Sequence, residues 1–96
     1  MPLHDFQALY GRYDAVIAQM PAVFTSHQFI LRLAHQNQRL YIDALDAYRH
    51  KPAPFMIVHG VLAAHLGALP RLEQLPDVAS RDIFGQSGTC ACWRKR

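Results

Sequence analysis

The sequence predicts a small, mainly α-helical domain of four or five helices that ends in a short β-hairpin or an irregular segment. Three observations lead to this fold class. Apolar residues recur at helical spacing over 3–20 and 25–48, and an almost continuous apolar run fills 54–69. Residues 81–93 form two short segments around a turn, which is typical of a hairpin. The 96 residues, 51% of them hydrophobic, are expected to form one domain, 1–96, that needs no metal or disulfide to bury a core.

The first predicted helix covers residues 3–20, within an N-terminal unit 1–21 that Pro21 ends. Its apolar stripe has two interpretations. It packs on the core of the domain, as amphipathic helices usually do, or it docks on a partner or on a second copy of the chain. The partner-binding candidates on this stripe are Phe6, Tyr10, Tyr13 and Ile17.

The strongest local signal is the start of a helix at Thr25. With Thr25 as N-cap, Gln28 completes a capping box, and Phe24 and Phe29 form a hydrophobic staple. No glycine or proline interrupts residues 25–51, so one long helix remains an alternative. We expect two helices or a kinked one, with the break at Asn37 or Gln38, because typical helices are shorter.

The run from Pro54 to Leu69 predicts the central helix of a helical core that spans 25–69. Pro54 suits the first turn of a helix, and Gly67 followed by Pro70 suits its end. Apolar residues fall on nearly every side of this helix, so we expect the rest of the protein to surround it. The run is too short to cross a bilayer, which needs about 20 apolar residues.

Residues 70–96 form the predicted C-terminal segment. We expect one helical turn over 70–75, ended by Pro76, and then a hairpin in which 81–84 pairs with 89–93. The alternative is an irregular coil anchored by Phe84 and Trp93.

The positive charge is expected to reside in a tail. Ten Lys and Arg against seven Asp and Glu give a net charge of +3, and the last three residues, Arg94, Lys95 and Arg96, carry all of that excess. The rest of the chain is formally neutral, so the net charge is only a weak argument for a basic binding face. We expect that deleting the three residues leaves the fold unchanged.

No catalytic residue, cofactor or metal site is predicted. Cys90 and Cys92 lack the C-x-x-C spacing of zinc and redox sites and would close too small a loop for an unstrained disulfide, so free thiols are expected. His59 and His65, six residues apart, point to different sides of a helix. No signal peptide is visible, which favours a cytoplasmic, reducing compartment without a membrane partner.

Two functional hypotheses follow. The first is a non-catalytic binding module that acts through contact with another protein or through self-association. The alternative is a winged-helix-like nucleic-acid-binding regulatory protein, with the hairpin as the wing. A helix-turn-helix within 55–69 is rejected, because its second helix offers only His65 to base edges. The winged-helix alternative would use basic residues on phosphates: Arg32, Arg39, Arg49, Lys51, Arg94, Lys95 and Arg96.

Overall fold

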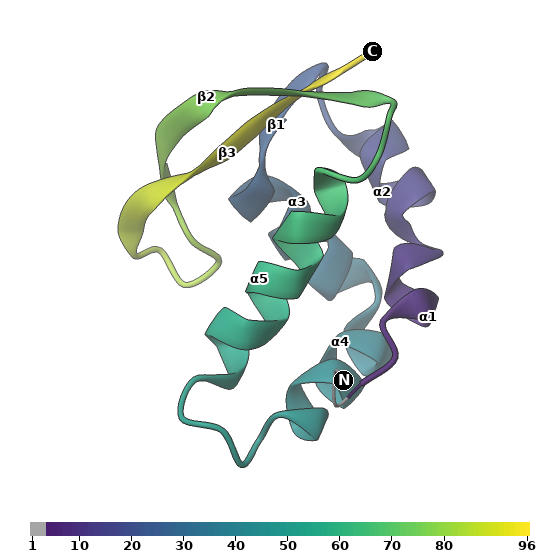
Figure 1. Ribbon diagram of the computed structural model, residues 1–96, viewed down its shortest axis with the longest axis vertical. Coiled ribbons are helices and arrows are strands. Elements are labelled where there is room, and N and C mark those ends of the chain that lie inside the picture. The colour runs from purple at the N-terminus through teal and green to yellow at the C-terminus, as the bar shows by residue number, and fades with distance from the viewer. Residues whose placement is uncertain (1–3) are drawn as a thin grey trace.

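A sheet lies at one end of a group of helices in the computed structural model, which describes residues 4–96 (Figure 1). The elements in chain order are α1 (Gln7–Tyr10), α2 (Tyr13–Gln19), β1 (Val23–Thr25), α3 (Ser26–Gln36), α4 (Gln38–Ala47), α5 (Pro54–Leu66), β2 (Leu72–Arg81) and β3 (Ser87–Lys95). The fold is therefore mixed α/β. The predicted class of a mainly α domain underestimated the sheet, because β2 extends through residues that were expected to form a helical turn.

The N-terminal helix predicted over 3–20 is two short helices, α1 and α2. Its first residue lies outside the described residues. The chain turns at Gly11 and Arg12, where the N–H of Gly11 bonds to the carbonyl of Gln7 and the N–H of Arg12 bonds to that of Leu9. The apolar stripe nevertheless faces inward, because the turn keeps both helices on the same side of the core.

Two helices, α3 and α4, fill the long segment after β1, as predicted, and the break lies at Asn37. Asn37 leaves the helical backbone conformation, and its side-chain amide donates to the carbonyl of Leu33. The predicted capping box at Thr25 is also confirmed. The Thr25 hydroxyl accepts from the N–H of Gln28 at 3.2 Å, and the Gln28 side chain accepts from the N–H of Thr25 at 2.9 Å.

The boundaries of α5 agree with the prediction, but its surroundings do not. Pro54 occupies the first turn and Gly67 is the C-cap. Only one face of α5 is fully buried, through Val58, Leu62 and Leu66. The expectation that protein surrounds this helix is wrong, because the β2–β3 hairpin covers the other face only in part.

The sheet is antiparallel in the order β1–β3–β2. The predicted hairpin exists, but its strands are longer and its register differs. Arg81 pairs with Ser87, so Ile83 and Phe84 belong to the turn. The predicted helical turn over 70–75 is wrong: Pro76 instead lies where the pairing is irregular, between Leu75 and Val78. Proline has no N–H to donate to the ladder, and an irregularity in an edge strand accommodates it.

Three long-range hydrogen bonds join the layers around the apolar core. The Tyr13 hydroxyl donates to the carbonyl of Leu62 at 2.6 Å and joins α2 to α5. The Trp93 indole N–H donates to the Ser26 hydroxyl at 2.8 Å and joins β3 to α3. Lys95 Nζ donates to the carbonyl of Met20 at 2.6 Å. Because the first two are buried, they also satisfy polar groups that would otherwise be costly inside the core.

Candidate functional site

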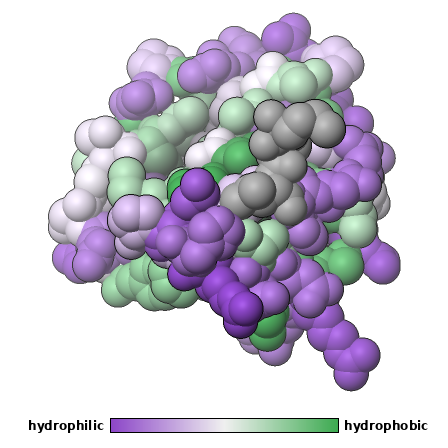
Figure 2. Space-filling model, turned by 60° about the horizontal axis from the view of Figure 1, so that its bottom comes forward, coloured by the Kyte–Doolittle hydropathy of each residue, from purple (hydrophilic) through white to green (hydrophobic). Residues whose placement is uncertain are grey.

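An open groove with a volume of about 900 Å³ lies between α5 and the β2–β3 hairpin. The first turn of α3 forms its floor. Figure 2 shows hydrophobic surface gathered around a hollow on one side of the molecule. Pockets of this size that are mostly apolar with a few polar groups are typical ligand sites. This groove is therefore the best candidate for a functional site.

Small residues of α5 line one wall of the groove. They recur at helical spacing on one face of the helix, at Gly60, Ala63 and Ala64, with Gly67 just beyond its end. A Cβ atom added at Gly60 would meet nothing within 4 Å. Gly60 is therefore not required for close packing inside the domain, although glycine within a helix costs about 1 kcal/mol relative to alanine. Its effect is to leave open space along the wall.

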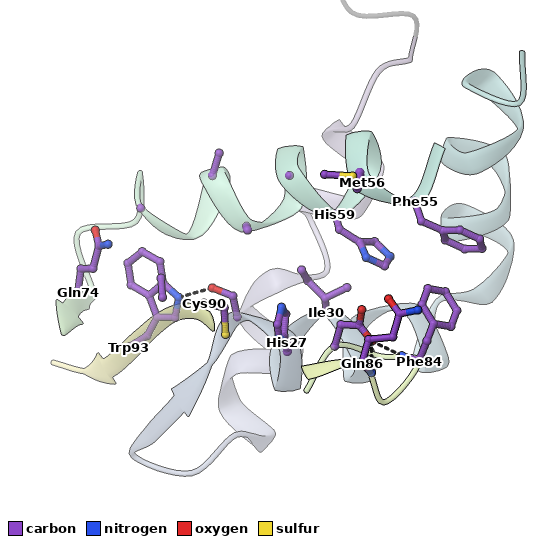
Figure 3. Close-up of a pocket in the computed structure, with 17 residues that line it drawn as sticks. His27, Ile30, Phe55, Met56, His59, Gln74, Phe84, Gln86, Cys90 and Trp93 are labelled. Carbon is purple, nitrogen blue, oxygen red and sulfur yellow. Dashed lines mark hydrogen bonds between the residues drawn. The ribbon is translucent and has the colours of Figure 1, made fainter. Parts of the chain in front are cut away.

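An aromatic cluster closes one end of the groove. Phe84 of the hairpin turn contacts Phe55 of α5 edge to face, with ring centroids 4.7 Å apart, and lies 6.3 Å from the ring of His59. In Figure 3, Phe55 and Phe84 lie at this end, and Trp93 and Gln74 lie at the other. The cluster leaves much apolar surface in solvent: Phe55 is 44% exposed and Phe84 is 55% exposed.

The hairpin turn that carries Phe84 is held by Asp82. Its carboxylate accepts from the N–H of Phe84 at 2.9 Å and from that of Gln86 at 3.0 Å. These hydrogen bonds, that from Gln86 first, hold the pKa of Asp82 below its ordinary value. Gly85 adopts φ +83°, which glycine reaches without strain. The turn therefore holds Phe84 against α5.

Two histidines face one another across the groove, His27 from α3 and His59 from α5 (Figure 3). His59 Nε2 lies 2.5 Å from the hydroxyl of Tyr41, and burial lowers the pKa of His59 below its ordinary value. His27 Nδ1 is shielded from solvent and has no hydrogen-bond partner.

The groove provides shape and hydrogen bonding, and the described residues form no recognisable metal centre. No three His, Cys, Asp or Glu side chains lie together as a ligand set anywhere in 4–96. Both cysteines are free thiols; Cys90 lines the groove and Cys92 is buried in the sheet. The arrangement is suited to holding an apolar group with a small polar part.

The predicted partner-binding stripe lies elsewhere and faces inward. Phe6, Tyr13 and Ile17 are buried in the core. Tyr10 is partly buried, and its ring stacks on that of His65 with centroids 3.6 Å apart. The stripe therefore packs on the domain, which was the first of its two interpretations. These four residues leave little surface for a partner.

The predicted phosphate-binding residues do not form one face. The C-terminus and the segment between α4 and α5, which contains Arg49 and Lys51, lie at opposite ends of the molecule (Figure 1). Several of the basic side chains already have partners. Arg32 donates to Gln19, Arg49 lies 3.7 Å from Asp46, and Arg94 lies 3.7 Å from Glu73. Arg39 and Arg96 are exposed.

The predicted basic tail is largely a strand. Arg94 and Lys95 belong to β3: Arg94 pairs with both neighbouring strands, and Lys95 pairs with Leu72 of β2. The N–H of Arg96 bonds to the carbonyl of Arg71. The interpretation of these residues as a free tail is therefore wrong, because their backbone completes the sheet.

Sequence reasoning missed the groove residues Phe55, Met56 and Phe84. Met56 is 78% exposed although it lies within the most apolar helix of the chain. The only signal in the sequence was that the residues of α5 are apolar on nearly every side of the helix. This pattern is compatible with complete burial or with an exposed binding face. Only the position of the hairpin distinguishes these cases.

Among the described residues, no helix combines the length and the apolar character needed to cross a membrane. No protein-family model, curated protein or solved structure matches the chain.

Proposed function

We propose that this protein is a non-catalytic binding module whose groove between α5 and the β2–β3 hairpin holds an apolar segment of another protein. The observation that carries the proposal is the open face of α5. The helix α5 is apolar on nearly every side, but the rest of the domain covers only part of it. Phe55, Met56 and Phe84 are exposed around the uncovered side. Contiguous exposed apolar surface on a small domain is typical of an interaction site.

The groove also has features that a flat apolar patch lacks. The α5 wall is lined by small residues, so an inserted side chain can approach the helix backbone closely. Asp82 Oδ1 and the Trp93 indole N–H, which adjoin the groove, are engaged within the domain. A partner segment would therefore displace water from apolar surface without breaking these bonds, which favours association.

Substitution of Gly60 tests this proposal. Gly60→Leu projects a bulky side chain into the groove from a position where an added Cβ meets no neighbour, and leucine favours a helix more than glycine does. Gly60→Ala is the matched control that leaves most of the groove open. Both variants should fold and be at least as stable as the parent in thermal unfolding followed by circular dichroism.

The binding measurement uses peptides selected on the parent protein by phage display. We expect the selected peptides to bind the parent and Gly60→Ala alike, and to bind Gly60→Leu at least about tenfold more weakly, since tenfold corresponds to about 1.4 kcal/mol. Light scattering on the same three proteins tests a second copy as the occupant. Peptides that bind Gly60→Leu as well as the parent would contradict the groove as the binding site.

Nucleic-acid binding remains a second candidate because of one observation. The hairpin follows directly on α5, and its second strand pairs with β1, in the order that a winged-helix arrangement requires. Against it, the open face of α5 presents Phe55, Met56, Gly60 and Ala63, none of which reads base edges as Arg, Lys, Asn or Gln can. A salt titration of duplex DNA binding distinguishes the two, because each phosphate contact contributes about 0.9 to the slope.

A further inference from the structure

Part of one edge of β3 has no strand beside it. Residues 92–94 pair with β1, but β1 ends at Thr25, where the chain turns into α3. Strand β3 continues past this point to Ser87 and pairs there with β2 alone (Figure 1). Among the described residues, no strand lies along residues 87–91 on the side of β1. The central strand of the sheet is therefore an edge strand over this half of its length.

The alternation of an antiparallel sheet identifies the unpaired backbone groups on this free edge. The N–H of Lys95 bonds to the carbonyl of Ala22, on the side of β1, and the carbonyl of Gln86 accepts from the residue after β2. Successive residues of a strand direct their backbone groups to opposite neighbours, so odd-numbered residues of β3 face the side of β1. The N–H and C=O groups of Ser87 and Thr89 therefore point away from β2, toward the side without a strand.

The long outer edge of β2 is protected against further pairing, whereas the free edge of β3 is not. Strand β2 contains Pro76 at its irregularity and three charged residues, Glu73, Asp77 and Arg81. Proline, charged side chains and irregular pairing are the means by which proteins prevent an exposed edge from pairing. Residues 87–91 contain neither proline nor a charged residue, and the first three of them are exposed. The free edge is therefore available to an incoming strand.

The free edge borders the groove. Gln86 and Cys90, which flank residues 87–89, both line the groove, as does Ala91. Side chains of neighbouring residues in a strand point to opposite faces of the sheet. A groove that is lined by both Cys90 and Ala91 therefore meets β3 at its edge. A segment paired with this edge would place alternate side chains in the groove, opposite the small residues of α5.

The charges around the groove favour a basic segment. Asp82 is the one carboxylate among the described residues that line the groove, and no lysine or arginine is among them. Asp82 accepts both of its hydrogen bonds at Oδ1, and its Oδ2 accepts none from the described residues. Because Asp82 lies in the hairpin turn, it adjoins the Ser87 end of the free edge. A lysine or arginine at that end of the segment would complement its charge.

We propose that the partner segment binds as an added β-strand, which pairs with β3 at Ser87 and Thr89 and continues the line of β1. The inference rests on the proposed function of the groove. Apolar side chains at alternate positions of the segment enter the groove, and a basic side chain lies beside Asp82. In this mode main-chain hydrogen bonds give affinity and a pocket selects alternate side chains. An extended segment elsewhere in an apolar groove would leave its own backbone groups unpaired, which is costly.

Hydrogen exchange followed by NMR tests the pairing directly, with a peptide selected on the parent protein as the probe. In the free protein the N–H groups of Gly88 and Cys90, which face β2, should exchange slowly, and those of Ser87 and Thr89 should exchange fast. The peptide should slow the second pair at least about tenfold, because a paired amide exchanges only when the strand opens. Exchange at Ser87 and Thr89 that the peptide leaves unchanged would overturn the added strand.

Thr89→Pro tests the same edge by substitution. The N–H of residue 89 faces away from β2, so proline removes a donor of the free edge and keeps the ladder of the hairpin. Thr89→Ala is the matched control, which keeps the N–H. Selected peptides should bind the parent and Thr89→Ala alike, and Thr89→Pro at least about tenfold more weakly, because a carbonyl of the peptide is left unpaired. Equal binding of the two variants would contradict the pairing. Should Thr89→Pro fail to fold, the exchange of the Thr89 N–H in the parent still decides.

Asp82→Asn tests the charge. The asparagine Oδ1 can still accept from the hairpin turn, while the negative charge is removed. Selected peptides should contain lysine or arginine and should bind Asp82→Asn about two- to fivefold more weakly at low salt, the range of an exposed ion pair. The difference should shrink as salt screens the charges. Unchanged binding at low salt, or selected peptides rich in aspartate and glutamate, would overturn the choice of a basic segment.

The failure of this inference can be distinguished from the failure of the proposed function. Peptides that are sensitive to Gly60→Leu but insensitive to Thr89→Pro would support the groove and overturn the added strand. Peptides that are insensitive to both changes would overturn both proposals.

Discussion

At the scale of single residues, Tyr13 and Leu62 join the N-terminal helices to α5. Leu62 is completely buried, and its backbone carbonyl accepts the buried hydroxyl of Tyr13, 49 residues away in the chain. Burial, with the charge of Tyr10 as a smaller cause, raises the pKa of Tyr13 above its ordinary value. The Tyr13 hydroxyl therefore stays protonated and can donate throughout the neutral range.

Leu62→Ala should lower the free energy of unfolding by about 2–5 kcal/mol, since it removes buried methyl groups and leaves a cavity. Urea denaturation followed by circular dichroism measures the loss. Met56→Ala in the same helix is the matched control, because Met56 is 78% exposed; its effect should stay within about 0.5 kcal/mol. Equal effects of the two changes would contradict the orientation of α5.

At the scale of elements, local signals predicted the helix starts well. The capping box of Thr25 and Gln28 is present, and Phe24 and Phe29 are both buried. These signals act within a few residues of one another, so they do not depend on the rest of the fold. The capping box also lies at the junction of β1 and α3, where Thr25 pairs with Cys92.

Thr25→Ala should destabilise the domain by about 0.5–2 kcal/mol, because the N–H of Gln28 loses its acceptor at the start of α3. Chemical denaturation measures the change. Thr25→Ser keeps the hydroxyl and should recover most of the stability. A serine variant as unstable as the alanine variant would show that strand packing, rather than the cap, determines the effect.

At the scale of the whole molecule, the C-terminal residues unite segments from both ends of the chain. Arg94 pairs with Val23 of β1 and with Glu73 of β2. Beyond the strand pairing, the N–H of Lys95 bonds to the carbonyl of Ala22, and its side chain bonds to that of Met20. The basic character of this segment is thus combined with a structural role.

Deleting residues 94–96 should lower the free energy of unfolding by at least about 1–3 kcal/mol, since several backbone hydrogen bonds are lost at about 0.5–1.5 kcal/mol each. The matched control is the double substitution Arg94→Gln and Arg96→Gln, which removes two charges and keeps the backbone. Thermal unfolding should distinguish the truncated chain from the control. Equal stability of the two would restore the interpretation of these residues as a tail.

The sequence by itself determined features that depend on near neighbours in the chain: the start of α3 and the start and end of α5. It favoured a break near Asn37 and a C-terminal hairpin, but left one long helix and an irregular coil as alternatives. Each is encoded by capping, proline or glycine chemistry within a few residues. The periodic spacing of the N-terminal stripe likewise indicated an inward face.

Only the tertiary structure decided how much of α5 is covered and which polar atoms meet across the groove. Strand β3 pairs with β1, which lies far away in the sequence, so the path of the hairpin depends on contacts that local patterns do not encode. That path leaves one side of α5 open, and the packing of α3 against α5 places His27 opposite His59. Hydrophobicity alone could not distinguish a buried side of α5 from a binding side, because both consist of apolar residues.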